Sequence, residues 1–555
     1  MAKSPKTNPV ILRRGMAIGT GNAETDDEFL FDCFVHHPAV GLCLNVQAAG
    51  AIALGRTGSG KTAIIRYIEA KEEHATDLDP AEMSMSYVAN SDALRFLNAI
   101  GADLDLLFQV LWKHVLCVEY IRLRWNVENS TKSVNVFERL VSKFNRDERK
   151  ARAIKYLKAW EGKFWITMDQ NIKEITEQIE ERLKAEFGAE IEKFKAGGGY
   201  ERGLTTEKKS EIIVRVRNII NADQLRELHG IIEMLADSAR GDDFARCFIL
   251  IDRLDEKWVD ESIRFKLIRG LISSLRQFRA IQNLKILVAL RTDILERVVQ
   301  ETSDITFQRE KFEDYFIKIS WSKRELKELV DRRIRLLFRR QYTSKDVEFY
   351  DVFTNKVRNK DPFEYILERT HMRPRDVIAF VNECFVVADG SYEVTPNQMY
   401  KAEAEYARKR RDALEQEWRS AYPSVGQLLK FITASRKVML EWSELLASAE
   451  LDNLALVICA EGATDFDPMI EPAQAVLDDK PSARLHFLRA VVSTLYRVGA
   501  VGVKLRPEDR FLYSHLDEPL ISPDILGEGA RIRIHAMLHG AYRLNEAERS
   551  RAHSM

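Results

Sequence analysis

The sequence predicts an α/β fold built on a parallel sheet, and three apolar runs carry this prediction. They are residues 49–54, 247–252 and 284–290. Each run is short and almost uniformly apolar, as expected for a strand that is covered on both faces of a parallel sheet. The first and third runs lead into stretches with helical spacing, 63–69 and 294–300. Strands that alternate with helices are typical of parallel sheets, so we expect an α/β core.

The composition is that of a soluble globular protein with several domains. The chain has 555 residues, and about 150 residues per domain would give three or four of them. Hydrophobic residues make up 45% and charged residues 30%. The 84 basic and 85 acidic side chains nearly cancel, so any binding to nucleic acid or to an anionic membrane would need a local patch.

Cysteine usage and hydropathy indicate the compartment. The six cysteines lie far apart without a Cys-x-x-Cys pair, which is typical of thiols in a reducing compartment. No signal peptide is evident, and no segment approaches the about 20 apolar residues that a membrane helix needs. We therefore expect a cytoplasmic protein without a membrane partner.

A glycine-rich loop follows the first predicted strand. Residues 55–62 read GRTGSGKT and fit the pattern G-x-x-x-x-G-K-[ST] at every fixed position. In this P-loop, or Walker A motif, backbone N–H groups surround phosphate, the lysine reaches the β- and γ-phosphates, and the last hydroxyl binds Mg²⁺. The predicted nucleotide-binding residues are Gly55, Arg56, Thr57, Gly58, Ser59, Gly60, Lys61 and Thr62.

The second predicted strand ends in an acid that suits a magnesium site. Asp252 stands where a Walker B aspartate would, and with Thr62 it is the predicted pair of metal ligands. Hydrolytic P-loop enzymes often carry a second acid directly afterwards to orient water, but Arg253 occupies that position. Asp255 or Glu256 could take this role, or these acids could cap the following helix.

The third predicted strand ends at a polar pair. In ATPases with an extra strand between the Walker A and Walker B strands, a polar sensor for the γ-phosphate lies here, and Arg291 or Thr292 could fill that role. Thr292 could equally cap the helix that follows. The sequence lacks an LSGGQ-like signature and an Asn-Lys-x-Asp motif, which argues against an ABC transporter ATPase and a GTPase. ATP with Mg²⁺ is the predicted ligand.

Two helical predictions flank this core. Residues 25–28 have the form of a capping box before an apolar helix face. Residues 126–240 form a polar insertion in which apolar side chains recur at helical spacing, so we expect a helical hairpin that could bind a partner, mediate a homo-oligomer or pack back. A basic run at 143–163 could contact DNA, although glutamates interleave there.

The C-terminal part has the pattern of a winged-helix module. A helix from Ser482 to Gly499 is followed by a predicted hairpin, 500–505 and 510–514. Three arginines would be available for DNA, and protein docking is the alternative role. They are Arg484, Arg489 and Arg497. His535 and His539 could share a helix face, but no third ligand accompanies them in sequence, so no zinc site is expected.

Together, several stretches resemble bacterial P-loop ATPases of the STAND/AAA-like kind, in particular a group met among defence genes. The stretches that carry the resemblance are 21–24, 55–62, 249–258, 285–294 and 371–376. The resemblance implies a lid helix whose first arginine senses phosphate, which corresponds to Arg373 or Arg375 here. It also implies a regulatory switch, with antiviral defence as its setting. Arg253 departs from the pattern and puts the rate of hydrolysis in question.

The resulting prediction has five parts: an N-terminal helix and the first part of the ATPase core, a helical insertion, the second part of the core, a helical lid, and a connector with a winged-helix-like domain. Their bounds are 1–125, 126–240, 241–325, 326–400 and 401–555. The predicted activity is ATP hydrolysis at the β–γ phosphoanhydride, coupled to a protein effector. The predicted catalytic residues are Lys61, Asp252, Asp255, Glu256, Arg291, Arg373 and Arg375. The alternatives are an ATP-driven DNA-binding or remodelling protein and an ATP-binding scaffold with little hydrolysis.

Overall fold

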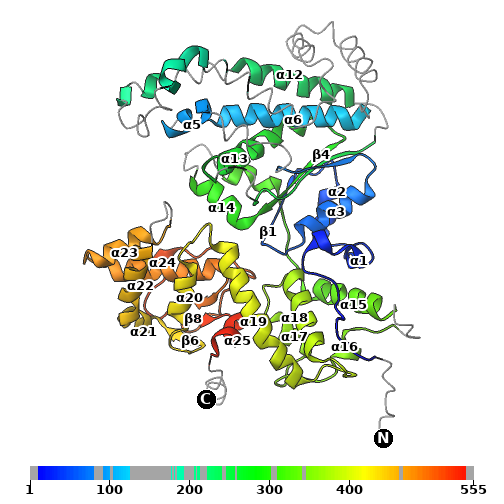
Figure 1. Cartoon of the computed structure of the whole chain (residues 1–555), viewed down its shortest axis with the longest axis vertical. Coiled ribbons are helices and arrows are strands. Elements are labelled where there is room, and N and C mark those ends of the chain that lie inside the picture. The colour runs from blue at the N-terminus through cyan, green and yellow to red at the C-terminus, as the bar shows by residue number, and fades with distance from the viewer. Residues whose placement is uncertain are drawn as a thin grey trace. The chain divides into compact units, whose positions relative to one another are not determined.

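A computed structural model gives the fold (Figure 1). It describes residues 10–80, 92–100, 104–125, 222–239, 245–256, 259, 261–301, 309–339, 346–461 and 467–544, together with short pieces between 177 and 212. The described chain forms two compact units. We call residues 36–56 and 61–319 the sheet unit, and residues 1–35, 57–60 and 320–555 the helical unit.

The sheet unit contains the parallel α/β core that the sequence predicts. Its five strands have the order β2-β3-β4-β1-β5, and all pairs are parallel. The strands are β1 (Ile52–Gly55), β2 (Ala75–Leu78), β3 (Cys247–Ile251), β4 (Leu284–Arg291) and β5 (Phe316–Lys318). β4 therefore lies between β1 and β3, so the strand that precedes the glycine-rich loop is not adjacent to the strand that precedes Asp252.

Helices cover this sheet because their apolar faces need a partner. They are α2 (Pro38–Leu44), α3 (Lys61–Lys71), α5 (Asp92–Ala99), α6 (Asp105–Trp125), α12 (Ala222–Ala239), α13 (Glu261–Phe278) and α14 (Thr292–Glu301), with the 3₁₀ turn η3 (Arg309–Tyr315) before β5. Helices α6 and α12 run side by side, and α6 also packs on α13 (Figure 1). β3 is buried along its whole length. The uniform apolar character of this strand thus reflects cover on both faces.

Part of the insertion packs back onto this core. Phe187, Ile191 and Ile212 are members of the apolar stripe predicted there, and all three are buried in the same hydrophobic cluster as α6 and α13. The basic run at 143–163 lies outside the described residues. For the described part of the insertion, packing back is therefore the observed alternative.

The helix predicted before the loop is much shorter than expected. The structure has a 3₁₀ turn η1 (Ala23–Thr25) and a single helical turn α1 (Asp27–Leu30). The capping box predicted at 25–28 is wrong, because the N-cap residue of α1 is Asp26 instead of Thr25 and the Asp26 side chain makes no cap hydrogen bond. Its carboxylate accepts the Thr20 N–H at 2.7 Å and pairs with the buried Arg333 guanidinium at 2.5 Å. The Asp26 carboxylate therefore forms a long-range ion pair with Arg333 and does not cap the helix.

The first part of the helical unit is a helical array. It comprises α15 (Lys323–Arg339), α16 (Phe349–Val352), α17 (Pro362–Leu367), α18 (Pro374–Val387) and α19 (Pro396–Trp418). Prolines at the first turns of α17, α18 and α19 suit positions where no backbone N–H is needed. The predicted charged connector lies in α19, where Arg410 is buried.

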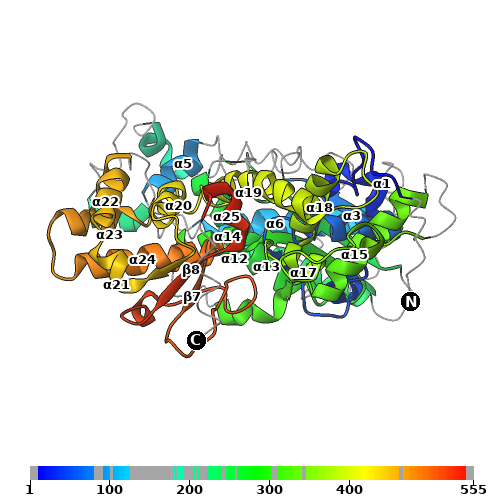
Figure 2. The ribbon, with the colours of Figure 1, turned by 90° about the horizontal axis from the view of Figure 1, so that it is seen from below.

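The C-terminal part of the helical unit combines helices with a small sheet (Figure 2). Its helices are α20 (Val425–Thr433), α21 (Trp442–Ala447), α22 (Ala449–Glu461), α23 (Ile470–Leu477), α24 (Ala483–Val498) and α25 (His539–Tyr542), with 3₁₀ turns η4 (Pro523–Ile525) and η5 (Ala536–Leu538). The antiparallel sheet has the order β6-β8-β7, with β6 (Met439–Glu441), β7 (Val501–Lys504) and β8 (Arg531–Ile534). Helix α24 ends, as predicted, at Gly499, which adopts the left-handed conformation with φ +86°.

The predicted hairpin is only partly correct. β7 pairs along its length with β8, whereas the stretch 510–514 contributes a single bridge, in which Val503 and Leu512 exchange two backbone hydrogen bonds. The physical reason is that β8, which arrives from farther along the chain, buries Ile532 and Ile534 completely in the core, whereas Phe511, Leu512 and Tyr513 are only half-buried. The sheet is therefore completed by a non-local strand.

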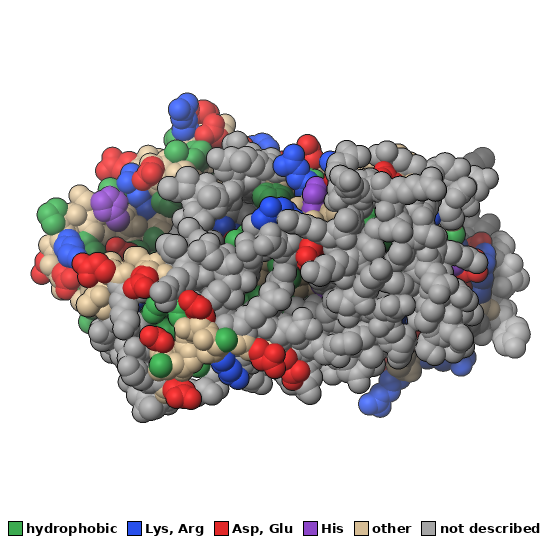
Figure 3. Space-filling model, turned by 90° about the horizontal axis from the view of Figure 1, so that it is seen from above, with side chains coloured by type: hydrophobic (Ala, Val, Ile, Leu, Met, Phe, Trp, Pro, Cys, Tyr) green, Lys and Arg blue, Asp and Glu red, His purple; other side chains and the backbone are tan. Residues whose placement is uncertain are grey.

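The distribution of charged side chains and the state of the cysteines agree with what the composition predicts. Basic and acidic side chains are interspersed on the described part of the face in Figure 3. All six cysteines are free thiols, and all but Cys459 are buried. Among the described helices, none has the length and apolar character needed to cross a bilayer.

Candidate functional site

The glycine-rich loop joins β1 to α3, as the sequence predicts. Gly58 and Gly60 have φ values of +77° and +99°, a region that disfavours side chains, so glycine is required at both positions. Lys61 opens α3, and its Nζ donates to the carbonyl oxygens of Gly55 and Arg56, each at 3.0 Å. Burial lowers the pKa of Lys61 to about 8 against the opposing field of Asp252. The ammonium group therefore rests on two carbonyls of its own loop.

Asp252, directly after β3, lies beside the start of α3. Its carboxylate accepts hydrogen bonds from the Thr62 hydroxyl and, at 2.8 Å, from the Arg253 N–H. Its Oδ2 is buried and accepts no hydrogen bond from the described residues. Desolvation raises the pKa of this carboxyl despite these two bonds. A buried carboxylate oxygen beside a threonine hydroxyl provides the hard oxygen ligands that Mg²⁺ prefers, so this pair fits the metal that the sequence predicts.

Arg253 points toward the neighbouring strand's end. It adopts a left-handed backbone conformation with φ +58°, and its guanidinium pairs with Asp79 at 2.8 Å and Asp77 at 3.4 Å. Burial is the main cause that raises the pKa of Asp77 to about 6, and Asp252 adds to it. The arginine that replaces the usual acid therefore neutralises two carboxylates at the end of β2, Asp77 within the strand and Asp79 just after it.

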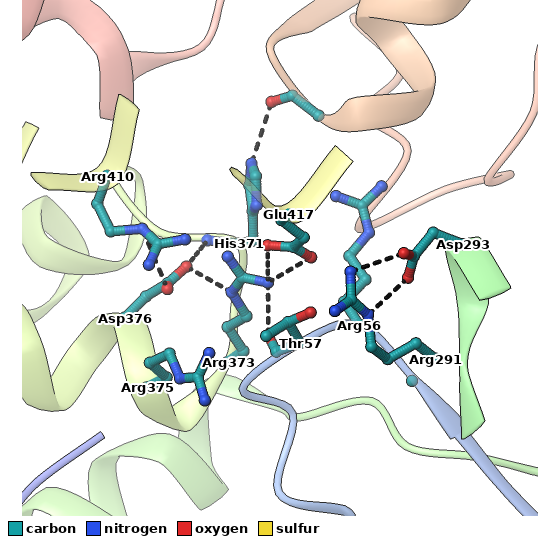
Figure 4. Close-up of polar contacts among 12 residues, drawn as sticks. Arg56, Thr57, Arg291, Asp293, His371, Arg373, Arg375, Asp376, Arg410 and Glu417 are labelled. Atoms are coloured by element: carbon teal, nitrogen blue, oxygen red, sulfur yellow. Dashed lines mark hydrogen bonds and ion pairs between the residues drawn. The ribbon is translucent and has the colours of Figure 1, made fainter. Parts of the chain in front are cut away.

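Arg291, the last residue of β4, is held between two acids. It makes a two-point bond to Asp293, with Nη2–Oδ2 at 2.6 Å and Nε–Oδ1 at 3.0 Å (Figure 4). Its Nη1 also donates to Asp255 at 2.9 Å. Helix α14 begins at Thr292. Asp255 also acts on the pKa values of Lys61 and Asp252. Of the two acids proposed to orient water, Asp255 therefore has a fixed position in this charge network, whereas Glu256 is exposed.

The two predicted lid arginines lie at the start of α18, in the helical unit. Arg373 is the N-cap residue and is buried. Its Nη1 donates to the Thr57 carbonyl at 2.5 Å and approaches Glu417 at 3.4 Å, while its Nε donates to Asp376 at 2.9 Å (Figure 4). Although burial opposes the charge, the two carboxylates raise the pKa of Arg373 above its ordinary value.

Arg375 contacts the next residue of the same loop segment, Gly58. Its backbone N–H donates to the Gly58 carbonyl at 3.4 Å, and its Nε donates to the Gly21 carbonyl at 3.0 Å. A Cβ on Gly58 would lie 2.6 Å from the Cβ of Arg375, so the approach requires glycine. Burial and the neighbouring Arg373 lower the pKa of Arg375. Both arginines thus bond to carbonyls of residues 57 and 58 within the helical unit.

Several participants in this site were missed by sequence reasoning. Asp376 and Glu417 hold Arg373, and Arg410 pairs with Asp376 at 3.5 Å. The Trp321 indole donates to the Ser59 carbonyl at 2.8 Å. Asp376 lies in the stretch 371–376 and could have been nominated, but nothing local in the sequence marks Glu417 or Trp321.

The arginines of α24 are engaged within the fold. Arg484 donates to the carbonyl oxygens of Leu446 at 2.7 Å and Ser448 at 3.2 Å. Arg489 donates to the Leu526 carbonyl at 2.8 Å, and Arg497 bonds the Tyr422 hydroxyl. Contacts of this kind fix the arginines against their own domain, which argues against α24 as a DNA-reading helix.

Comparison with known proteins gives two partial matches. Residues 324–415 match the FunZ-associated C-terminal helical domain, a stretch that runs from α15 into α19. Among curated proteins, the chain is similar to the putative transposon gamma-delta 80.3 kDa protein of Escherichia coli (strain K12), at 24% identity over 276 residues. This similarity covers 48% of the chain and 36% of that protein, so the chain spans about a third of its relative's length. No solved structure matches.

Proposed function

We propose that the protein is a Mg²⁺-dependent ATP-binding and ATP-hydrolysing switch of the STAND/AAA-like kind. One observation carries the proposal: within the sheet unit, the Thr62 hydroxyl bonds the Asp252 carboxylate, and Asp252 acts on the charge of Lys61. A loop lysine, a hydroxyl and a strand-end aspartate are the groups that Mg²⁺–triphosphate needs. They come from positions nearly 200 residues apart, so their association requires the fold.

Each of these residues has a defined role in the proposal. The N–H groups of residues 55–62 and the Lys61 ammonium would hold the phosphates, and Thr62 with Asp252 would hold Mg²⁺, which supplies charge neutralisation at the β–γ phosphoanhydride. Asp255 would orient the attacking water because Arg291 fixes its carboxylate. Arg291 would act as the sensor, since a ligand charge beside it competes with its two acidic partners.

The switch would operate through the carbonyls of the loop. Arg373 and the Arg375 backbone bond the carbonyl oxygens of Thr57 and Gly58. A phosphate group bound to this loop draws its N–H groups inward and thereby reorients the carbonyls on the same peptide planes. The hydrogen bonds of both arginines must then change, so ligand binding would alter the start of α18. A ligand shifts such an equilibrium by its differential affinity for the two states.

The output of the switch would be a protein effector. The helices and small sheet after α19 would form a winged-helix-like docking module, consistent with the internal engagement of the α24 arginines. A regulatory role in antiviral defence, in the cytoplasm, follows from the resemblance given above. The alternative, an ATP-driven DNA-binding or remodelling protein, is less favoured because the α24 arginines are bonded within the fold. A homo-oligomer would form through the helical insertion.

The test removes the loop ammonium. Lys61→Ala is expected to weaken Mg²⁺·ATP binding by about 10- to 150-fold, because a hydrogen bond to a charged group contributes about 1.5–3 kcal/mol. Isothermal titration measures the affinity, and single-turnover hydrolysis of wild type separates a hydrolase from an ATP-binding scaffold. Lys71→Ala, at the exposed end of the same helix, is the matched control. Wild-type affinity in Lys61→Ala would refute the proposal.

A further inference from the structure

Three histidines from distant parts of the chain meet in the helical unit. His371 precedes α18, His515 lies between β7 and β8, and His535 follows β8 directly. One ring nitrogen from each lies within 4.8 Å of the others, and the ring centroids are 5.0 to 5.1 Å apart. We propose that they bind one divalent transition-metal ion of the Zn²⁺ type. Three imidazoles are a ligand set that suits this class of ion.

The surroundings of His371 orient it for this role. Its Nε2 lies 3.0 Å from the Gly499 carbonyl oxygen, which can only accept a hydrogen bond (Figure 4). The ring proton therefore sits on Nε2, and the lone pair is on Nδ1. Metal-binding histidines commonly donate their second nitrogen to a backbone carbonyl, which fixes the tautomer and the ring. His371 is buried, so its Nδ1 is shielded from bulk water.

His535 must change a hydrogen bond to bind the ion. Its Nδ1 accepts the Met537 N–H at 3.1 Å. If the metal takes Nδ1, it uses the lone pair of this bond. If the metal takes Nε2, the ring proton moves to Nδ1, which then becomes a donor. In both cases the Met537 N–H loses its acceptor, so metal binding has a signature at one backbone amide.

The fourth coordination position would be open. His515 and His535 line a cavity of about 370 Å³, together with Glu364, Glu368, Tyr513 and Arg533. A site with three protein ligands keeps a position for water or a small anion, and the cavity gives an ion access from solvent. His515 is partly exposed, whereas the other two histidines are buried.

The site would add a metal-mediated link between the segment before α18 and the small sheet, which already touch where His371 Nε2 meets the Gly499 carbonyl. The backbone N–H of His371 donates to Asp376, the same carboxylate that holds Arg373. A metal bound to His515 and His535 would therefore brace the arginine segment against the small sheet. The inference does not depend on ATP binding, since none of the three histidines belongs to the proposed nucleotide site.

The test uses untagged full-length protein and two ions. ZnCl₂ titration by calorimetry is expected to give one site per chain, and Co²⁺ is expected to give visible absorption bands of a low-coordinate nitrogen site. His515→Gln should weaken Zn²⁺ binding by at least about 100-fold, because even second-sphere changes cost 10- to 100-fold. His486→Gln, an exposed histidine on α24, is the matched control and should bind as wild type.

Two binding results and one hydrogen-exchange result would contradict the proposed metal site. Absence of a stoichiometric site in wild type, or equal Zn²⁺ affinity in wild type and His515→Gln, would overturn the proposal and leave the three rings as a packing cluster. Hydrogen exchange gives a readout that does not need a variant. Zn²⁺ should accelerate exchange of the Met537 amide, and unchanged protection with the ion bound would remove His535 from the ligand set.

Discussion

Replacing Asp376 by asparagine should destabilise the helical unit strongly. Asp376 is fully buried and accepts hydrogen bonds from Arg373 at 2.9 Å and from the His371 N–H at 3.0 Å, with Arg410 at 3.5 Å. Asp376→Asn keeps the shape but leaves two buried guanidinium groups without this counter-charge. Removing one partner of a buried ion pair costs about 3–5 kcal/mol. Arg373 retains Glu417 and the Thr57 carbonyl, so we expect the lower end of that range.

The assay is thermal unfolding followed by circular dichroism. A loss of about 3 kcal/mol corresponds to a decrease of roughly 6 °C in the Tm of a unit of this size. Asp346→Asn is the matched control, because Asp346 pairs with Arg339 on the surface and its loss should leave the Tm unchanged. Equal Tm values for wild type and Asp376→Asn, or equal decreases in both variants, would refute the reasoning.

The Tm difference between wild type and Asp376→Asn should depend on pH in a defined direction. Burial alone would raise the pKa of Asp376, but Arg373 and Arg410 outweigh it, so its folded-state pKa lies below the usual value. Such a carboxylate stabilises the fold above its unfolded pKa and loses this effect as the pH falls through the folded pKa. The Tm difference between wild type and Asp376→Asn should be constant from about pH 5 to 8 and narrow below about pH 4.

Two further predictions concern the loop and the water-orienting acid. Gly58→Ala and Gly60→Ala should each cost about 1–2 kcal/mol, because alanine disfavours the left-handed backbone conformation. Gly58→Ala should lower the Tm more, because its Cβ would lie 2.6 Å from Arg375, whereas the nearest atom to a Cβ at Gly60 is 3.7 Å away. Equal Tm values for the two variants would contradict this. Asp255→Asn should reduce kcat for ATP by about 100-fold or more, and Glu256→Gln should change it little, because a positioned proton acceptor contributes about 10²–10⁴-fold. The reverse order of the two kcat values would assign the role to Glu256.

The sheet and its loop could be predicted because their signals are local. An apolar run of a few residues specifies a buried strand wherever it lies, and the glycines of residues 55–60 specify their own backbone geometry. The same local reasoning was wrong for residues 25–28, where a capping box was expected and Asp26 instead takes the N-cap position without a cap hydrogen bond. A carboxylate near a helix start can cap the helix or pair with a distant cation, and Arg333, 307 positions away, decides between them.

The histidines give a second example in which local sequence reasoning does not identify a distant partner. The spacing of His535 and His539 suggested a shared helix face without a third ligand. In the structure, the Nε2 of His539 lies 3.0 Å from the Ile534 carbonyl, and His535 instead meets His371 and His515. No spacing rule could have joined three positions spread over more than 160 residues.

By itself, the sequence determined the parallel core, the loop between β1 and α3, and an acid at the end of β3, because propensity and burial act through neighbouring residues. Only the tertiary structure decided which charges meet. It paired Arg253 with Asp77 and Asp79, gave Arg373 to Glu417, and set Arg291 between two acids. Electrostatic partners are chosen by distance in space and by what else is buried with them, and the order of residues along a chain does not encode that distance locally.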